Sequence, residues 1–457
     1  MKADPAPARR PTLALFAPMP PLRNGIADYV AAMLPGLAEH REVHVFTEYD
    51  EAVVAPPGVQ VHPYRDFEWM DARAPFAAVM YHVGNNVCHG FMMNCLYVHP
   101  GIVVLHDWNL HRFLAYCHLR KGDQRAYIDE MVYCHGERGR QAAHLTIRGF
   151  YAEMLFHLYP MNRLVIESAA CVAVHNRWTA RRIGLDQPGA EVRVVPFYSS
   201  RPVAAMEDVR GVREKYTLEA GFTLGAFGMV TSYKGFRELF QALAVLRQRG
   251  VPARLLVVGA LDNADALRAQ CREQQVEELV TFTGYVSKSE LWALMNGVDV
   301  GVNLRYPTQG ETSACLRELM SCGRAVIIPD YRQFREYPAD SCVRVPLGRP
   351  LVGALVDVLE RLAADPDARR VLGERARRYV RERDAPASVV EAYEGLFHDY
   401  PRRRRPGSLL GRPGLPHLSD VRAWTAAHIR RESVLVAGDP DVPEDLLEEL
   451  LLVEEKK

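Results

Sequence analysis

The chain has 457 residues, with 56 Lys and Arg against 56 Asp and Glu, and 48% of its residues are hydrophobic. This length exceeds what one hydrophobic core normally supports, so two domains are expected. The balanced charge lacks the basic excess of nucleic-acid-binding proteins, and we expect no nucleic acid partner. The nine cysteines are unpaired in spacing, which favours a reducing compartment over a disulfide framework.

Residues 1–10 are polar and proline-rich, unlike a secretory signal. No apolar run reaches the roughly 20 residues that a membrane span needs. The sequence therefore predicts a cytoplasmic protein, with peripheral contact at a membrane left open.

The first half alternates strand-like apolar runs with amphipathic segments of helical length. Strands are predicted at 12–18, 42–48, 76–83, 101–107 and 170–176. Helices are predicted at 26–40 and over a long stretch from about 111 to 169. Such alternation predicts a parallel sheet covered on both faces, hence a Rossmann-like domain over residues 1–195.

The segment 192–208 contains two prolines and two serines after a strand and predicts a linker. The pattern then restarts, with strands predicted at 222–230, 253–260, 279–286, 299–306, 324–330 and 341–347. We expect a second doubly wound α/β domain over 196–380, a closing helix over 381–400, and a basic linker with a short appendage over 401–457. Two such domains would face a cleft at the carboxyl ends of both sheets, where ligands of open α/β sheets usually bind.

Polar residues follow two strands of the first domain. Asn24 and Gly25 lie between a strand and a helix, where backbone amides favour a phosphate or a sugar; a tight turn explains the glycine equally well. His106 ends another strand and could bind a sugar hydroxyl or move a proton. The alternative is a structural histidine. No spacing typical of metal ligands appears, so no metal is expected.

In the second domain, Gly228 follows a strand and Lys234 stands just before the next helix. A lysine there can reach a diphosphate as a compact positive charge. The alternative is a solvated surface lysine. Neither a G-x-G-x-x-G nor a Walker fingerprint is present.

The stretch 306–338 carries a pair of glutamates around an apolar helix. Gly310 breaks the preceding strand, and Thr312 or Ser313 can cap the helix. Glu311 would stand beside the free amides at the helix start, and Glu318 about two turns further on, on nearly the same face. A nucleotide sugar suits this arrangement. The alternative is that Glu311 caps the helix and Glu318 is solvated.

These motifs resemble a known family in their order and spacing. "NGIADY", "VLHD", "GMVTSYKGF", "FTGYV" and "GETSACLRELMSCGRAVI" are similar to motifs of the family-4 retaining glycosyltransferases, over roughly residues 12–398. The resemblance implies the GT-B fold, which is two Rossmann-like domains facing a cleft. It also implies an N-terminal domain that binds the acceptor and a C-terminal domain that binds a nucleoside-diphosphate sugar of the UDP or GDP class.

The resemblance also implies roles for single residues. Catalytic roles fall to His106, Lys234 and Glu311. Donor-binding roles fall to Asn24, Gly25, Gly228, Lys234, Tyr285, Val286, Arg305, Gly310, Glu311, Thr312, Ser313 and Glu318. Neither a metal nor a cofactor is implied.

Three positions depart from the family pattern. Asn24 stands where the family usually has glycine, and Met229 where it usually has arginine; Arg305 could replace that cation. The family places seven residues between its two glutamates, whereas six separate Glu311 from Glu318, so the first family position falls on Gly310.

The expected activity is therefore retaining transfer of a sugar, hexosyltransferase-like, to an acceptor hydroxyl on a glycan, a lipid or a small molecule. A sugar-nucleotide epimerase, a glycosyl phosphorylase and a non-catalytic nucleotide-sugar-binding protein stay open as alternatives, because a fold does not fix a reaction. The sequence indicates neither the acceptor nor the oligomeric state.

Overall fold

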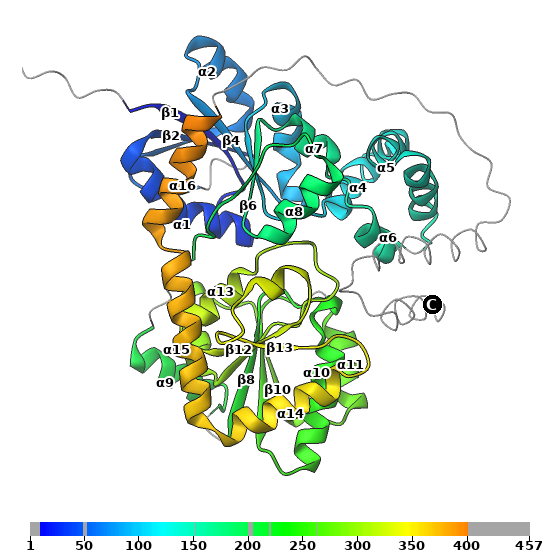
Figure 1. Cartoon of the computed structure of the whole chain (residues 1–457), viewed down its shortest axis with the longest axis vertical. Helices are drawn as coiled ribbons and strands as arrows, with labels where there is room; N and C mark the ends of the chain where they lie inside the picture. Colours follow the sequence, from blue (N-terminus) through cyan, green and yellow to red (C-terminus); the bar gives the residue numbers. More distant parts are fainter. Residues whose placement is uncertain are drawn as a thin grey trace, which may run out of the picture. The chain divides into compact units, whose positions relative to one another are not determined.

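The computed structural model describes residues 10–48, 53–150, 152–199, 204–218, 221–261 and 263–400. They form two compact α/β units, each with its own sheet flanked by helices (Figure 1). In the described part, unit 1 comprises residues 10–198, 309–312 and 386–400, and unit 2 comprises 199–308 and 313–385. The predicted linker and appendage at 401–457 lie outside the described residues.

Unit 1 is built on a parallel sheet of seven strands in the order β3-β2-β1-β4-β5-β6-β7. The central strands are buried on both faces, as expected for a sheet between two helical layers. The strands are β1 (Thr12–Phe16), β2 (Glu42–Thr47), β3 (Val59–Pro63), β4 (Ala78–Val83), β5 (Ile102–Leu105), β6 (Cys171–Val174) and β7 (Val192–Val194).

All five strands predicted for the first domain are present, and two more were missed. β3 lies at one edge of the sheet and is only partly buried, so its sequence lacks a clear apolar run. β7 takes the start of the predicted linker and pairs with β6. Edge strands are short and mixed in polarity, which hides them from pattern analysis.

The predicted helical stretch at 111–169 is divided into the elements α4 (His111–Leu119), α5 (Gln124–Ile147), α6 (Ala152–Leu158) and α7 (Arg163–Ser168). The longest of them, α5, is kinked at Gly136, whose φ is +64°. Gly122 and Gly149 have positive φ angles of 73° and 78° and end the first two helices, while Pro160 follows the third. The other helices of unit 1 are α1 (Gly25–His40), α2 (Phe67–Arg73), α3 (Met93–Val98), α8 (Arg177–Asp186) and α16 (Pro386–Asp399).

Unit 2 contains a parallel six-stranded sheet in the order β10-β9-β8-β11-β12-β13. All six predicted strands are present, as β8 (Phe222–Phe227), β9 (Ala253–Val258), β10 (Val280–Gly284), β11 (Val300–Val302), β12 (Ala325–Pro329) and β13 (Val343–Val345). Its helices are α9 (Met206–Lys215), α10 (Phe236–Gln248), α11 (Ala264–Glu273), α12 (Lys288–Gly297), α13 (Ala314–Ser321), α14 (Leu351–Ala364) and α15 (Pro366–Arg383).

The end of the described chain returns to unit 1. Helix α15 belongs to unit 2, whereas α16 packs in unit 1. There the hydroxyls of Tyr29 and Tyr393 lie 3.0 Å apart, and Arg41 pairs with Glu394 at 2.8 Å. The closing helix predicted at 381–400 is therefore α16.

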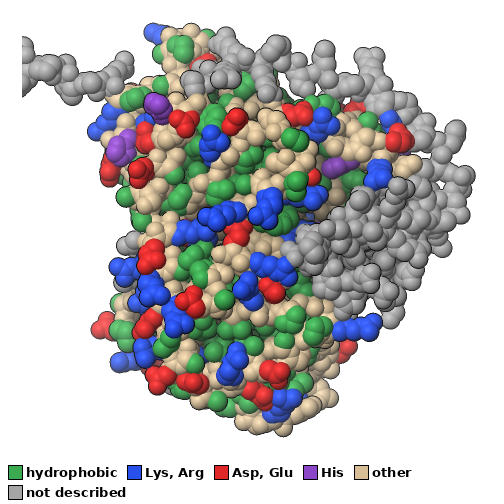
Figure 2. All heavy atoms as spheres, in the orientation of Figure 1, with side chains coloured by type: hydrophobic (Ala, Val, Ile, Leu, Met, Phe, Trp, Pro, Cys, Tyr) green, Lys and Arg blue, Asp and Glu red, His purple; other side chains and the backbone are tan. Residues whose placement is uncertain are grey.

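On the face that Figure 2 shows, Lys and Arg side chains are interspersed with Asp and Glu, as the balanced charge suggests. All nine cysteines are free thiols. No helix in the described ranges is both long and apolar enough to cross a membrane.

Candidate functional site

The carboxyl end of β8 in unit 2 is shaped by two glycines that touch each other. Gly228 follows β8 with a φ of +89°, and Gly259 follows β9 with a φ of +138°. A Cβ on Gly259 would stand 2.3 Å from the Gly228 carbonyl oxygen, a distance that no side chain tolerates. The strand ends therefore present bare backbone, which is how α/β sheets let a ligand approach closely.

Lys234 lies at this edge, as its sequence position suggested. Its Nζ donates to the Phe227 carbonyl at 3.1 Å and would stand 3.3 Å from a Cβ built on Gly228. The lysine ends a short 3-10 turn (Ser232–Lys234), and Gly235 follows in the left-handed conformation before α10. The turn thus fixes a positive charge beside the open end of β8.

The thiol of Cys315 lies next to Gly228, and three residues predicted for this site act on its pKa: Lys234, Arg305 and Glu318. The Cys315 Sγ would stand 3.1 Å from the same Cβ on Gly228. Burial raises the pKa of this thiol, the Glu318 carboxylate raises it further, and Lys234 and Arg305 oppose both. Two cations and one carboxylate therefore act electrostatically on this thiol, which lies beside Gly228 at the carboxyl end of β8.

Cys315 was not predicted for this site. It is one of nine cysteines without motif spacing, and its neighbours Ala314 and Leu316 are apolar. Its proximity to Lys234 arises because the start of α13 lies next to Gly228, after β8, and no local pattern signals it.

Helix α13 starts later than the glutamate pair suggests. Its N-cap is Ser313, whose hydroxyl accepts from the Leu316 amide at 3.4 Å and from the Asn303 side chain at 2.8 Å. Glu318 is half-buried on α13, so it is neither fully solvated nor part of the core.

Glu311 lies outside the helix, and its loop groups with the other unit. Residues 309–312 cluster with unit 1, whereas Glu318 belongs to unit 2. A Glu311 carboxylate oxygen accepts from the Gln309 amide at 2.8 Å. The two glutamates therefore do not form one helical pair in this structure.

The residues predicted near the nucleotide base follow β10. Gly284 has a φ of +69°, Tyr285 is 56% exposed and Val286 packs at the edge of a hydrophobic core. Met229, at the position where the family has arginine, is 58% exposed. Arg305, like Lys234, lowers the pKa of the Cys315 thiol through its positive charge.

In unit 1, Asn24 caps the N-terminus of helix α1. Its side-chain oxygen accepts from the Ile26 amide at 2.7 Å and from the Ala27 amide at 3.4 Å, and its amide donates to the Cys88 sulfur at 3.3 Å. It is the N-cap of α1. These two amides are thus already paired, while Gly25 next to them is exposed and a Cβ there would meet open space.

His106 belongs to a buried group of aromatic and imidazole rings. Its Nε2 lies 3.0 Å from the Nδ1 of His82, and its ring contacts His175 at 5.2 Å and Tyr29 at 5.1 Å between centroids. Only one hydrogen fits between the two nitrogens. Burial, and then the neighbouring histidines, lower the pKa of His106 well below its usual value, so it is neutral at pH 7.

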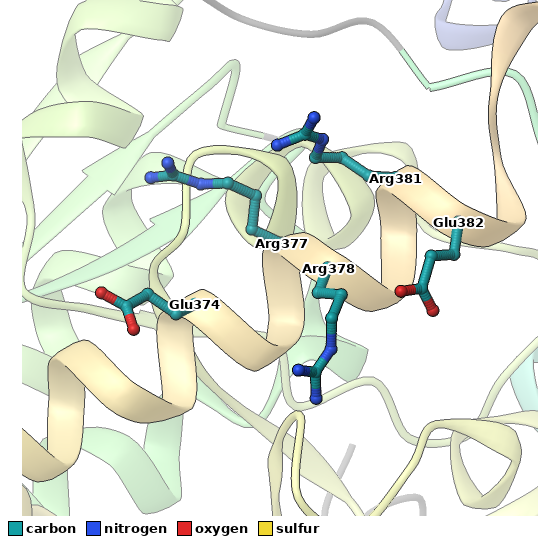
Figure 3. Close-up of a pocket in the computed structure, with 5 residues that line it drawn as sticks. All are labelled: Glu374, Arg377, Arg378, Arg381 and Glu382. Carbon is teal, nitrogen blue, oxygen red and sulfur yellow. The ribbon is translucent and has the colours of Figure 1, made fainter.

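Among the residues that the structure describes, no three His, Cys, Asp or Glu side chains are arranged as metal ligands. A pocket of about 480 Å³ lies on α15, and Figure 3 shows Arg377 and Arg381 extending from one side of this helix and Arg378 from the other. None of the residues predicted for donor binding is among those that line it, which are Glu374, Arg377, Arg378, Arg381 and Glu382. Arg377 also donates to the Cys322 carbonyl at 3.1 Å, which is a structural contact.

Residues 213–379 match the family model described as glycosyl transferases group 1. Over 146 residues the chain is 27% identical to a 2-deoxystreptamine glucosyltransferase of Streptomyces kanamyceticus, covering 31% of this chain and 38% of the relative. Over 237 residues it is 22% identical to an uncharacterized glycosyltransferase of Bacillus subtilis strain 168, covering 51% and 63%. The chain thus spans less than two thirds of either curated relative.

A structural neighbour covers the chain more fully. The Anabaena protein HepE, crystallised in complex with UDP-glucose, is similar with a TM-score of 0.61 and 13% identity, over 85% of this chain and 99% of that one. This similarity and the two parallel-sheet units confirm the predicted GT-B fold. The matched family region contains Gly228, Lys234, Arg305 and Glu318.

Proposed function

We propose that the protein is a retaining glycosyltransferase that moves a sugar from a nucleoside-diphosphate sugar to an acceptor hydroxyl. The observation that carries this proposal is the position of Lys234 beside the bare backbone of Gly228 at the end of β8, where the charges of Arg305 and Glu318 also act on the neighbouring Cys315 thiol. The match of this region to glycosyl transferases group 1 and the names of both curated relatives support a glycosyltransferase.

The charges suit the two halves of a nucleotide-sugar donor. The negative charge of a diphosphate requires cations, which Lys234 and Arg305 supply. Arg305 would replace the arginine that the family usually has at the position of Met229. A ribose offers hydroxyl donors, which the Glu318 carboxylate accepts. The backbone at Tyr285 and Val286 would hold the base. A UDP or GDP sugar fits this scheme, and the UDP-glucose bound by HepE supports the donor class.

The reaction would follow from stabilising the leaving group. The bond between the anomeric carbon and the diphosphate oxygen breaks, and the acceptor oxygen bonds to that carbon on the same face. The acceptor's proton passes to a departing diphosphate oxygen. Lys234 and Arg305 offset the charge that grows on the diphosphate, which is often the largest catalytic contribution. This scheme uses no metal and no cofactor.

Residues of unit 1 would contact the sugar. We assign the Nδ1 of His106 a hydrogen bond to a sugar hydroxyl, because the Nε2 is already paired with His82 and a hydroxyl can serve Nδ1 as donor or as acceptor, whichever tautomer is present. Glu311 would accept from another sugar hydroxyl, and Gly25 would leave room for the donor. The acceptor would bind unit 1.

Binding is tested first, by thermal shift with a panel of UDP and GDP sugars. A donor that binds the folded state raises the apparent stability. The stabilising donor is then incubated with glycan, lipid and small-molecule acceptors, and NMR reads the anomeric configuration of the product. A product with the donor's configuration supports the proposal, and an inverted product contradicts it.

The same incubation separates the alternative activities. Conversion of the donor sugar without an acceptor would indicate an epimerase. A strict need for inorganic phosphate would indicate a phosphorylase. Binding without any turnover across the acceptor panel would indicate a non-catalytic binding protein.

A further inference from the structure

The loop that carries Glu311 is held in part through the carbonyl of Gly310, and Asn176 also donates to the Thr312 hydroxyl at 3.4 Å. The Gly310 carbonyl oxygen accepts from the Asn176 side-chain amide at 3.0 Å and from the Thr179 hydroxyl at 3.0 Å. Both donors are buried, at 6% and 1% exposure, and both come from the start of α8. They lie more than 130 residues away in the sequence, so this contact is made by tertiary folding alone.

Asn176 can make this contact in one orientation only. Its Oδ1 accepts from the Thr179 amide at 2.8 Å, as the N-cap of α8. Its Nδ2 is therefore the atom that faces the Gly310 carbonyl. The start of α8 thus presents two hydrogen-bond donors in a fixed geometry, and both lone pairs of the Gly310 carbonyl have a partner.

Gly310 itself has no room for a side chain. Its φ is +81°, and a Cβ would stand 2.6 Å from the Cβ of Trp108 and 3.2 Å from the Thr179 hydroxyl. The neighbouring Gln309 is also tied down, because its carbonyl accepts from the Asn109 amide at 3.0 Å. A glutamate cannot occupy position 310 in this loop. In this chain the glutamate that the family has at this position therefore stands one residue later, as Glu311.

We propose that Asn176 and Thr179 are positioning residues that hold the Gly310 carbonyl and thereby aim Glu311 at the sugar of the donor. This inference rests on the proposed function, since it assigns the two residues a part in sugar binding. The hydrogen bonds set the backbone at Gly310, and the side chain of Glu311 starts at the next Cα. A loop released from α8 would leave that carboxylate free to turn away from the sugar.

The proposal predicts a selective loss. Glu311 would touch the sugar but not the nucleotide, so releasing its loop should weaken binding of the nucleotide sugar and spare the nucleoside diphosphate. A purely structural role for Thr179 would not distinguish the two ligands. The ratio of the two affinities is therefore the quantity to measure.

The test uses the full chain and isothermal calorimetry. The ligands are UDP-glucose against UDP and GDP-mannose against GDP, and the pair that the wild type binds is carried forward. Thr179→Val removes the hydroxyl at nearly constant volume, and Thr179→Ser keeps it as the matched control. We expect Thr179→Val to bind the nucleotide sugar about 3- to 10-fold more weakly, as for one lost buried hydrogen bond, with the affinity for the diphosphate unchanged. Thr179→Ser should stay close to wild type.

A double-mutant cycle tests the route through Glu311. Glu311→Gln should show the same selective loss, and Thr179→Val combined with Glu311→Gln should lose little more than either alone. Wild-type affinity in Thr179→Val, an equal loss for both ligands, or additive losses in the double variant would each overturn the positioning role. If Thr179→Val fails to fold, Asn176→Asp, which sets a carboxylate oxygen against the Gly310 carbonyl, replaces it in the cycle.

Failure of the proposed function has a separate signature. A wild-type chain that binds neither nucleotide sugar would overturn the donor assignment, and the positioning role with it. Wild-type binding together with an unaffected Thr179→Val variant would overturn the positioning role alone.

Discussion

Asp384→Asn should destabilise unit 2 more than any surface change on the same helix. The Asp384 carboxylate lies 2.9 Å from a guanidinium nitrogen of Arg317, with side-chain exposures of 0% and 3%. The Arg317 guanidinium also lies over the rings of Tyr337 at 4.8 Å and Tyr379 at 5.4 Å. Arg317 precedes Glu318 on α13, and Asp384 is the C-cap of α15. The ion pair therefore links α13, which carries Glu318, to the end of α15.

The magnitude follows from the burial of both charges. Removing one partner of a buried pair leaves the other charge without compensation and costs about 3–5 kcal/mol. In a domain of this size, 1 kcal/mol corresponds to a Tm shift of about 2–4 °C. The Tm of unit 2 should thus fall by about 6–20 °C.

Glu374→Gln on α15 is the matched control. Glu374 pairs with Arg370 at 2.9 Å, but both side chains are 60% exposed. Exposed i,i+4 pairs contribute little to stability, so the Tm should fall by only a small fraction of the drop expected for Asp384→Asn.

Differential scanning calorimetry measures both variants. Arg317→Met added to Asp384→Asn removes the orphaned charge as well, and should recover part of the lost stability. Equal, small Tm shifts for Asp384→Asn and Glu374→Gln would refute the argument, because they would mean that the buried pair is no stronger than an exposed one.

Three further predictions concern the site and its pH dependence. Lys234→Ala should lower kcat roughly 100- to 1,000-fold, as for loss of one preorganised charge contact. The control is Lys215→Ala, which removes a surface ion pair with Glu290 and should leave kcat unchanged. Equal rates in both variants would contradict the role of Lys234 at the diphosphate. Glu318→Ala should weaken both the nucleoside diphosphate and the nucleotide sugar roughly 10- to 100-fold in calorimetry, from lost bonds to a charged group, and unchanged affinity would remove Glu318 from the donor site. Unit 1 should lose stability as the pH falls from 6.5 towards 4. Burial lowers the pKa of His89 from 6.5 to about 4 and those of His82 and His106 well below 6.5, so the unfolded chain binds protons first. The described part of unit 2 contains no histidine, so its stability should not fall in this way. Hydrogen exchange, corrected for intrinsic rates, should show β4 and β5 losing protection before β8 and β9 as the pH falls. Simultaneous loss in both units would contradict the prediction.

Local sequence patterns determined most of the fold. Strands that form apolar runs were predicted, eleven in all, and these include the partly buried edge strands β10 and β13 of unit 2. Lys234 was also predicted correctly at the end of β8, because a glycine after a strand and a lysine before a helix lie within seven residues of each other. Such features depend on neighbours along the chain.

Contacts between distant segments decided the rest. Cys315 and Lys234 come together because both lie next to Gly228 at the end of β8, although they are 81 residues apart in the sequence. The one-residue displacement of Glu311 is explained by Trp108, which leaves Gly310 no room for a side chain, and by donors on α8 that hold its carbonyl. The sequence alone paired Glu311 with Glu318 because they are close along the chain. The tertiary structure groups them with different units, because hydrogen bonds from α8 and the steric limit at Gly310 outweigh proximity in sequence.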